Sequence, residues 1–112
     1  MRAVATATEV VQVQFTASSK ELADRIAGTL LDRRLVACAQ SIGPLESRYW
    51  WQGELESARE WLVLCKTTAA RVDDTVAAVV AGHDYEVPEV LVTPVHGGSA
   101  AYLAWVADAV RG

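Results

Sequence analysis

The side chains that could do the most chemistry lie close together, between positions 83 and 90. An imidazole, three carboxylates and a phenol fall within seven residues, namely His83, Asp84, Tyr85, Glu86 and Glu89. They directly precede the apolar run Val90-Leu91-Val92, which is typical of a buried strand. Polar groups beside a buried strand need either protein partners or a ligand, because unpaired buried charge is costly. The segment is therefore either a binding site or a structural clasp.

Divalent metal binding is one chemistry that this segment could support. His83, Glu86 and Glu89 offer nitrogen and oxygen donors, a mixture that suits zinc, copper or nickel. A His-x-x-Glu spacing outside a helix does not fix a shared geometry, however. His96 lies a whole strand away from His83, on the order of 20 Å if extended, so both cannot bind one ion within one subunit. His83 is the candidate metal ligand, for copper or zinc, and we expect no cofactor to be required.

Binding of a small ligand is a second chemistry for the same region. Lys66, Tyr85, Glu86 and Glu89 are expected near strand ends, where converging polar side chains line pockets. A small anionic or polar ligand in a cleft between subunits would use these groups. The alternative is that Lys66 pairs with Glu86 or Glu89 in a satisfied interface network, which makes the segment a clasp.

Catalysis has the least support in the sequence. His83 beside Asp84 could form an oriented base, but adjacent residues are expected to point apart. No serine or cysteine nucleophile has an obvious partner, and phosphate-loop, dinucleotide and nucleophile-elbow motifs are absent from the sequence. We therefore expect a protein that is not an enzyme.

Charge and hydropathy exclude two classes of partner. The 112-residue chain has a formal net charge of −4, whereas binding to nucleic-acid phosphates requires a basic surface. No apolar run is long enough to span a bilayer. Residues 1–8 lack the apolar centre of a signal peptide and are expected to be a flexible leader. Cys38 and Cys65 have no metal-site spacing, so we interpret them as buried, reduced thiols of a cytoplasmic protein.

Alternation of apolar and polar residues predicts four strands. They cover residues 9–15, residues 36–51, residues 54–66 and residues 89–95. Gly43-Pro44 predicts a bulge or bend within the second strand, because proline cannot donate to a strand ladder. Gln52-Gly53 predicts a tight turn that joins the second and third strands into a long hairpin.

Helices are expected between these strands and at the C-terminus. Ser18, with Glu21 as its capping-box partner, predicts the start of the first helix, and Thr67 or Thr68 that of the second. The second helix would bury Val72, Val76, Val79 and Val80 and end at Gly82, and Ser99 would cap the third. The order β-α-β-β-α-β plus a helix predicts a single α+β domain over residues 9–112, of the ferredoxin-like type.

One subunit leaves apolar residues without cover. Tyr49, Trp50 and Trp51 are consecutive, so aromatic rings are expected on both faces of a two-stranded ribbon. In the fourth strand, Val90 and Val92 flank Leu91, so both faces of that strand need burial. Such surfaces usually contact another chain, and we predict a homo-oligomer with Tyr49, Trp50, Trp51, Val90 and Val92 at its interface.

Five stretches of the chain carry a family resemblance. They are Arg34-Leu35-Val36-Ala37-Cys38-Ala39-Gln40, Tyr49-Trp50-Trp51-Gln52-Gly53-Glu54-Leu55-Glu56, Lys66-Thr67-Thr68, Tyr85-Glu86-Val87-Pro88-Glu89-Val90 and Tyr102-Leu103-Ala104-Trp105. In order and spacing they resemble the CutA divalent-cation-tolerance proteins. The resemblance implies a ferredoxin-like subunit in a homotrimer similar to the PII signalling proteins, with clefts between subunits and a role in tolerance to copper and other divalent cations.

The chain departs from that family pattern at four positions. Gln40 replaces a common asparagine and Asp84 a common proline. Phe15 and Gly82 stand where some relatives suspected of binding copper have a cysteine and a second histidine. The residues and the resemblance together predict a cytoplasmic homotrimer that binds a metal ion or small ligand at clefts between subunits. The alternative is a structural or signalling trimer in which the polar segment is only an interface clasp.

Overall fold

The first strand forms the centre of the sheet. The computed structural model describes residues 9–111, and in it β1 runs over Val10–Ala17. Val11, Val13 and Phe15 are fully buried, while Gln12 and Gln14 between them are only partly buried. Because successive side chains of a strand point to opposite faces, β1 presents one apolar face to the core and one polar face away from it.

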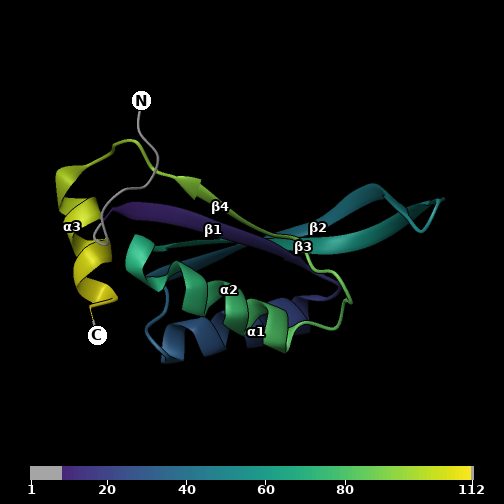
Figure 1. Cartoon of the computed structure of the whole chain (residues 1–112), viewed down its shortest axis with the longest axis horizontal. Coiled ribbons are helices and arrows are strands. Elements are labelled where there is room, and N and C mark those ends of the chain that lie inside the picture. The colour runs from purple at the N-terminus through teal and green to yellow at the C-terminus, as the bar shows by residue number, and fades with distance from the viewer. Residues whose placement is uncertain (1–8, 112) are drawn as a thin grey trace.

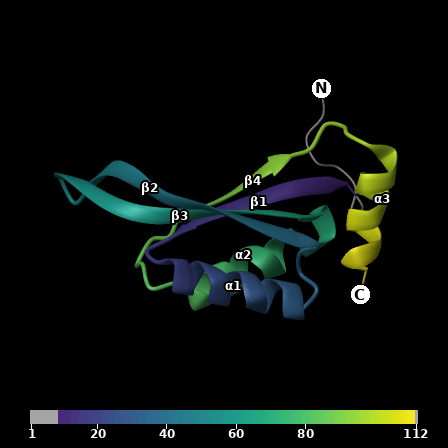
Figure 2. The same cartoon turned by 180° about the vertical axis from the view of Figure 1, so that it is seen from behind.

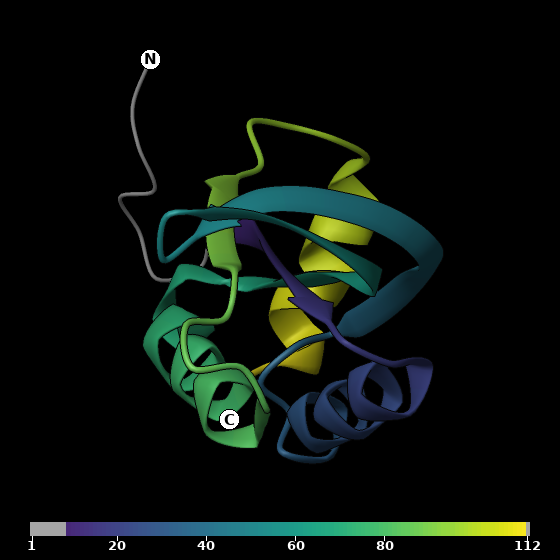
Figure 3. The same ribbon diagram turned by 90° about the vertical axis from the view of Figure 1, so that its right-hand side faces the viewer.

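The described residues form an α+β arrangement with one antiparallel sheet. The strand order is β2-β3-β1-β4, and β1 pairs with both β3 and β4. Helices α1 and α2 lie side by side on one face of the sheet, and α3 lies at the end away from the hairpin tip (Figures 1 and 3). The remaining bounds are α1 Lys20–Asp32, β2 Cys38–Trp51, β3 Glu54–Thr68, the 3-10 helix Ala69–Arg71, α2 Val72–Gly82, β4 Val90–Pro94 and α3 Ala100–Ala109.

The first helix begins one residue later than the sequence predicts. Ser19, not Ser18, caps α1, because the Ser19 hydroxyl accepts a hydrogen bond of 3.0 Å from the backbone N–H of Leu22. The capping box of Ser18 with Glu21 is therefore wrong. The Ser18 hydroxyl instead donates to Asp84 at 2.8 Å, which joins the start of α1 to the segment after α2.

The second helix also begins later than predicted, and neither threonine caps it. Thr67 and Thr68 belong to β3, and the buried Thr67 hydroxyl donates to the Leu35 carbonyl at 2.6 Å. Val80 of α2 is 50% exposed, which contradicts its predicted burial. Val79 is fully buried as expected.

The hairpin follows the prediction closely. Gln52 and Gly53 have φ values of 50° and 81°, the left-handed backbone that a tight hairpin turn requires. The predicted irregularity at Gly43-Pro44 is confirmed, because the β2–β3 register shifts between Ile42 and Leu45. The tip of the hairpin projects beyond the helices (Figures 1 and 2).

Two sequence-based expectations concern the ends and the membrane. Residues 1–8, predicted to be a flexible leader, lie outside the described residues. Within residues 9–111, none of the helices combines the length and the apolar character that crossing a bilayer would need.

Candidate functional site

A groove of about 800 Å³ lies between the β2–β3 hairpin and the segment that follows α2. Its lining comes from three parts of the chain, namely Thr16, residues 47–51 with Glu60, and residues 84–87 with Glu89. Strand β1 supplies Thr16, the β2–β3 hairpin supplies three of the aromatic residues, and the segment before β4 supplies Tyr85 and most of the carboxylates. The lining is therefore both aromatic and acidic.

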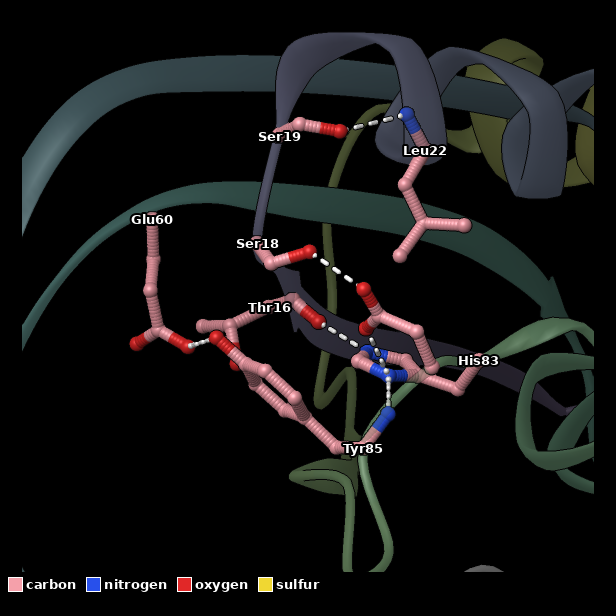
Figure 4. Close-up of polar contacts among 8 residues, drawn as sticks. Thr16, Ser18, Ser19, Leu22, Glu60, His83 and Tyr85 are labelled. Atoms are coloured by element: carbon pink, nitrogen blue, oxygen red, sulfur yellow. Dashed lines mark hydrogen bonds and ion pairs between the residues drawn. The ribbon is translucent and has the colours of Figure 1, made fainter.

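The deepest acid of the groove is Glu60. It is only 5% exposed, and its carboxylate accepts a hydrogen bond of 2.9 Å from the Tyr85 hydroxyl (Figure 4). Burial, and then this hydrogen bond to Glu60, raise the pKa of the Tyr85 hydroxyl above its ordinary value of 10.0. Tyr85 is consequently protonated at neutral pH and acts as the donor.

His83 anchors the segment to the sheet. Its side chain is fully buried, one ring nitrogen, Nδ1, accepts a hydrogen bond of 3.1 Å from the Tyr85 N–H, and the other, Nε2, lies 2.6 Å from the Thr16 carbonyl oxygen (Figure 4). Because Nδ1 is an acceptor, Nε2 carries the proton and donates to Thr16. The rings of His83 and Tyr85 also pack together, with centroids 4.8 Å apart.

Asp84 adds a second anchor. One carboxylate oxygen accepts the hydrogen bond from Ser18, and the other lies 3.5 Å from His83 Nδ1. The expectation that adjacent His83 and Asp84 side chains point apart is therefore wrong. The pair is used structurally, because both nitrogens of the imidazole already contact the backbone.

Three of the four predicted ligand-binding residues line the groove. Tyr85, Glu86 and Glu89 are among them, but Lys66 is not. Lys66 pairs in register with Gln12 and Cys38, and its ammonium group donates to the Gln40 side chain at 3.2 Å. The predicted pairing of Lys66 with Glu86 or Glu89 is absent among the described ion pairs.

The residues predicted to form an oligomer interface differ in exposure. Trp50 is 73% exposed, and Tyr49, Trp51 and Val92 are also exposed. Val90 is partly buried against the hydrophobic core of its own chain. Tyr49, Trp50 and Trp51 also line the groove, so the predicted interface and the groove share the same aromatic residues.

The described side chains of the single chain do not form a metal centre. Within residues 9–111 no group of three or more histidine, cysteine, aspartate or glutamate residues could hold an ion. Phe15 is fully buried in the core, and Gly82 lies against Ile26. Both His83 nitrogens already have partners, so metal binding by His83 stays a prediction.

Comparison with known proteins bears on this arrangement. A family model described as CutA1 divalent ion tolerance protein matches residues 11–109. The divalent-cation tolerance protein CutA of Archaeoglobus fulgidus is 35% identical over 88% of this chain and 96% of its own length. The chain belongs to the CutA family. The resemblance found in the sequence is thereby confirmed.

The match to CutA proteins extends to plants and to solved structures. Protein CutA 1, chloroplastic, of Oryza sativa is 34% identical over 99% of this chain, but the chain spans only 63% of that protein and 56% of the Arabidopsis thaliana relative. The Oryza sativa CutA1 crystal structure has a TM-score of 0.90 at 34% identity and covers 96% of this chain and 98% of its own. CutA from Xylella fastidiosa has a TM-score of 0.89 at 30% identity and covers 92% and 99%. The four-stranded antiparallel sheet with three helices is thus that of the CutA structures.

Among the charged groove residues of this CutA chain, Glu60 and Arg48 were not predicted from the sequence. Glu60 directly precedes the apolar run of residues 61–65, and strand alternation places it on the face of Leu62 and Leu64. A carboxylate in phase with apolar residues of a buried strand is the signal that could have identified it. Arg48 carries no comparable signal.

Proposed function

We propose that this chain serves divalent-cation tolerance as a cytoplasmic homotrimer of ferredoxin-like subunits, similar to the PII proteins, with its groove as the ligand site and without catalysing a reaction. Membership of the CutA family supports the role in divalent-cation tolerance, since relatives from Archaeoglobus fulgidus and Thermus thermophilus are named divalent-cation tolerance proteins. The strand order β2-β3-β1-β4 supports the ferredoxin-like subunit.

Self-assembly is supported by exposed apolar surface on the hairpin and on β4. Trp50 and Leu55 of the hairpin are exposed, as are Leu91 and Val92 of β4. Both β2 and β4 are edge strands of the described sheet, and an exposed apolar edge favours pairing with another chain. A neighbouring subunit would cover surface that a lone subunit leaves in water.

The observation that carries the proposal is the position of the groove. Its lining includes Tyr49, Trp50 and Trp51 on the projecting hairpin and Glu86 and Glu89 before β4. A subunit that docks on the hairpin would therefore close the groove and turn it into a cleft between chains. Since one subunit offers no group of three metal-binding side chains among its described residues, copper or zinc would require carboxylates from two subunits.

Light scattering and calorimetry test the two parts separately. We expect a mass near three times the 12.1 kDa subunit, a weaker assembly for Trp50→Ser, and no change for Leu31→Ser, an exposed apolar residue on α1. A monomer at micromolar concentration would refute the trimer. Titration of chelator-treated protein with copper and zinc should give saturable binding, which Glu86→Gln weakens.

A structural or signalling scaffold is the second candidate. The observation that favours it is that His83 and Asp84 make their contacts inside the subunit, with Thr16, Tyr85 and Ser18. On this hypothesis the trimer forms but calorimetry shows no saturable binding of either metal. Glu86→Gln would then change assembly, or nothing, without a metal effect.

A further inference from the structure

The groove has an excess of negative charge. Four carboxylates line it, those of Glu60, Asp84, Glu86 and Glu89, against the single guanidinium of Arg48. Like charges around one cavity focus a negative potential and raise the local concentration of cations. An anionic ligand would be repelled, so the small anionic ligand expected from the sequence fits this lining poorly.

Within this excess of negative charge, the buried carboxylate of Glu60 has the greatest need of a positively charged partner. The carboxylate is 5% exposed and has the Tyr85 hydroxyl as a neutral donor. Among the described ion pairs none involves Glu60, although Arg48 lines the same groove. A buried carboxylate without a counter-charge is unfavourable, and a cation that enters the groove would supply that charge.

The aromatic residues restrict the kind of cation. Tyr49, Trp50, Trp51 and Tyr85 line the groove together with the carboxylates. Aromatic faces, tryptophan above all, attract ammonium and guanidinium groups and contact the carbon atoms attached to them. Metal ions gain little from such rings, because they need several oxygen, nitrogen or sulfur ligands at short distance.

The size of the groove also favours an organic cation over a metal ion. About 800 Å³ falls within the roughly 300–1,000 Å³ of small-molecule sites, and it far exceeds the space of a single metal ion. We propose that this groove binds a small organic ammonium ion, with the charged nitrogen toward Glu60 and the carbon chain against the tryptophans. This assignment rests on the proposed function, in that it takes the groove as the ligand site and names the class of its ligand.

The test uses the full chain in its native assembly and a pair of matched probes. Calorimetric titration with 1,6-diaminohexane at low ionic strength should give saturable binding, whereas hexane-1,6-diol, of the same length and without charge, should give none. Raising the salt concentration should weaken diamine binding, because the interaction is between charges.

Variants connect the binding to the groove. Glu60→Gln keeps an acceptor for Tyr85 but removes the charge, and we expect it to weaken diamine binding about tenfold or more. Glu46→Gln, an exposed hairpin acid outside the lining, is the matched control and should leave the affinity unchanged. If Glu60→Gln fails to fold by circular dichroism, Glu86→Gln at the rim provides the same test with a smaller expected loss.

The outcomes separate the ligand class from the proposed function. Equal binding of diamine and diol, or equal affinity of the Glu60 and Glu46 variants, would overturn the inference. If the diamine does not bind but copper or zinc does, and Glu86→Gln weakens the metal, the groove remains the ligand site and only the organic cation is wrong. Absence of binding for the diamine and for both metals would overturn both proposals.

Discussion

Removing the Tyr85 hydroxyl is expected to destabilise the protein because it leaves a buried carboxylate without its donor. In Tyr85→Phe the ring remains, but Glu60, at 5% exposure, loses the 2.9 Å hydrogen bond. A hydrogen bond to a charged group contributes about 1.5–3 kcal/mol to stability. Because the groove lets water approach Glu60, we expect a loss near the lower end of this range, about 1.5–2 kcal/mol.

The same hydrogen bond should be worth less once Glu60 is neutral. Glu60→Gln keeps an amide oxygen that can accept from Tyr85, and it removes the cost of a buried charge. A neutral hydrogen bond contributes about 0.5–1.5 kcal/mol, so Tyr85→Phe should cost about 1 kcal/mol in the Glu60→Gln background. The difference between the two backgrounds is the coupling between the residues, roughly 0.5–1 kcal/mol.

Urea unfolding of the four proteins of this double-mutant cycle measures the coupling. Circular dichroism at pH 7 and a fixed protein concentration is required, since any assembly adds to the apparent stability. Tyr49→Phe, at an exposed tyrosine of the same groove, is the control and should stay within about 0.5 kcal/mol of the wild type. The reasoning is refuted if Tyr85→Phe and Tyr49→Phe unfold alike, or if the cycle gives no coupling.

The pH dependence of stability provides an independent check on Tyr85. Burial and the bond to Glu60 raise the pKa of Tyr85 in the folded state, so the folded protein holds this proton more tightly than the unfolded chain. The contribution is complete below the ordinary tyrosine pKa of about 10 and is lost as the pH rises beyond it. The wild type should therefore lose more stability than Tyr85→Phe between about pH 9 and pH 11. Parallel curves would contradict the assignment.

The remaining predictions concern glycines and cysteines. A Cβ at Gly43 would lie 2.5 Å from Trp61 Cδ1, so Gly43→Ala should lower the urea unfolding free energy by about 1–3 kcal/mol, whereas Gly28→Ala, with open space inside α1, should raise it by about 0.5–1 kcal/mol. Equal effects of the two changes would contradict this. Burial raises the pKa of the Cys65 thiol to about 12, so iodoacetamide at pH 8 should label Cys65 only after unfolding but Cys38, which is partly exposed, in the native protein. Peptide mass spectrometry would show the opposite order if the reasoning fails.

Local sequence patterns predicted turns and helix caps well where contacts between neighbouring residues determine them. The Gln52-Gly53 turn and the Ser99 cap of α3 depend on neighbouring residues, and both are present. The starts of α1 and α2 were misplaced because distant partners decide them. Ser18 donates to Asp84, 66 residues away, and Thr67 donates to the Leu35 carbonyl, 32 residues away. A hydroxyl with a tertiary partner is not available as a cap.

The residues of the groove were predicted only in part, because contacts between distant parts of the chain decide which of them line it. Tyr85, Glu86 and Glu89 share one short segment, so any arrangement of that segment brings them close together. Glu60 and Lys66 sit on the same strand, yet Glu60 lines the groove and Lys66 contacts Gln40. Which position of a long strand lies beside a given loop depends on strand register and on how the segment after α2 packs, and neither is written in local composition.

In the structure, some residues of the segment 83–89 anchor it to the rest of the chain, and others line the groove. The buried His83 side chain holds the segment to Thr16 (Figure 4). The Asp84 side chain is 56% exposed and accepts a hydrogen bond from Ser18. Tyr85 connects these anchors to the groove, because its N–H donates to His83 while its hydroxyl donates to Glu60. The clasp therefore fixes the position of the ring that contacts the deepest acid of the groove. A segment that only bound a ligand would not require the buried His83 imidazole. A segment that only anchored the chain would not require a hydrogen bond to Glu60 of β3, whose carboxylate has no counter-charge among the described ion pairs.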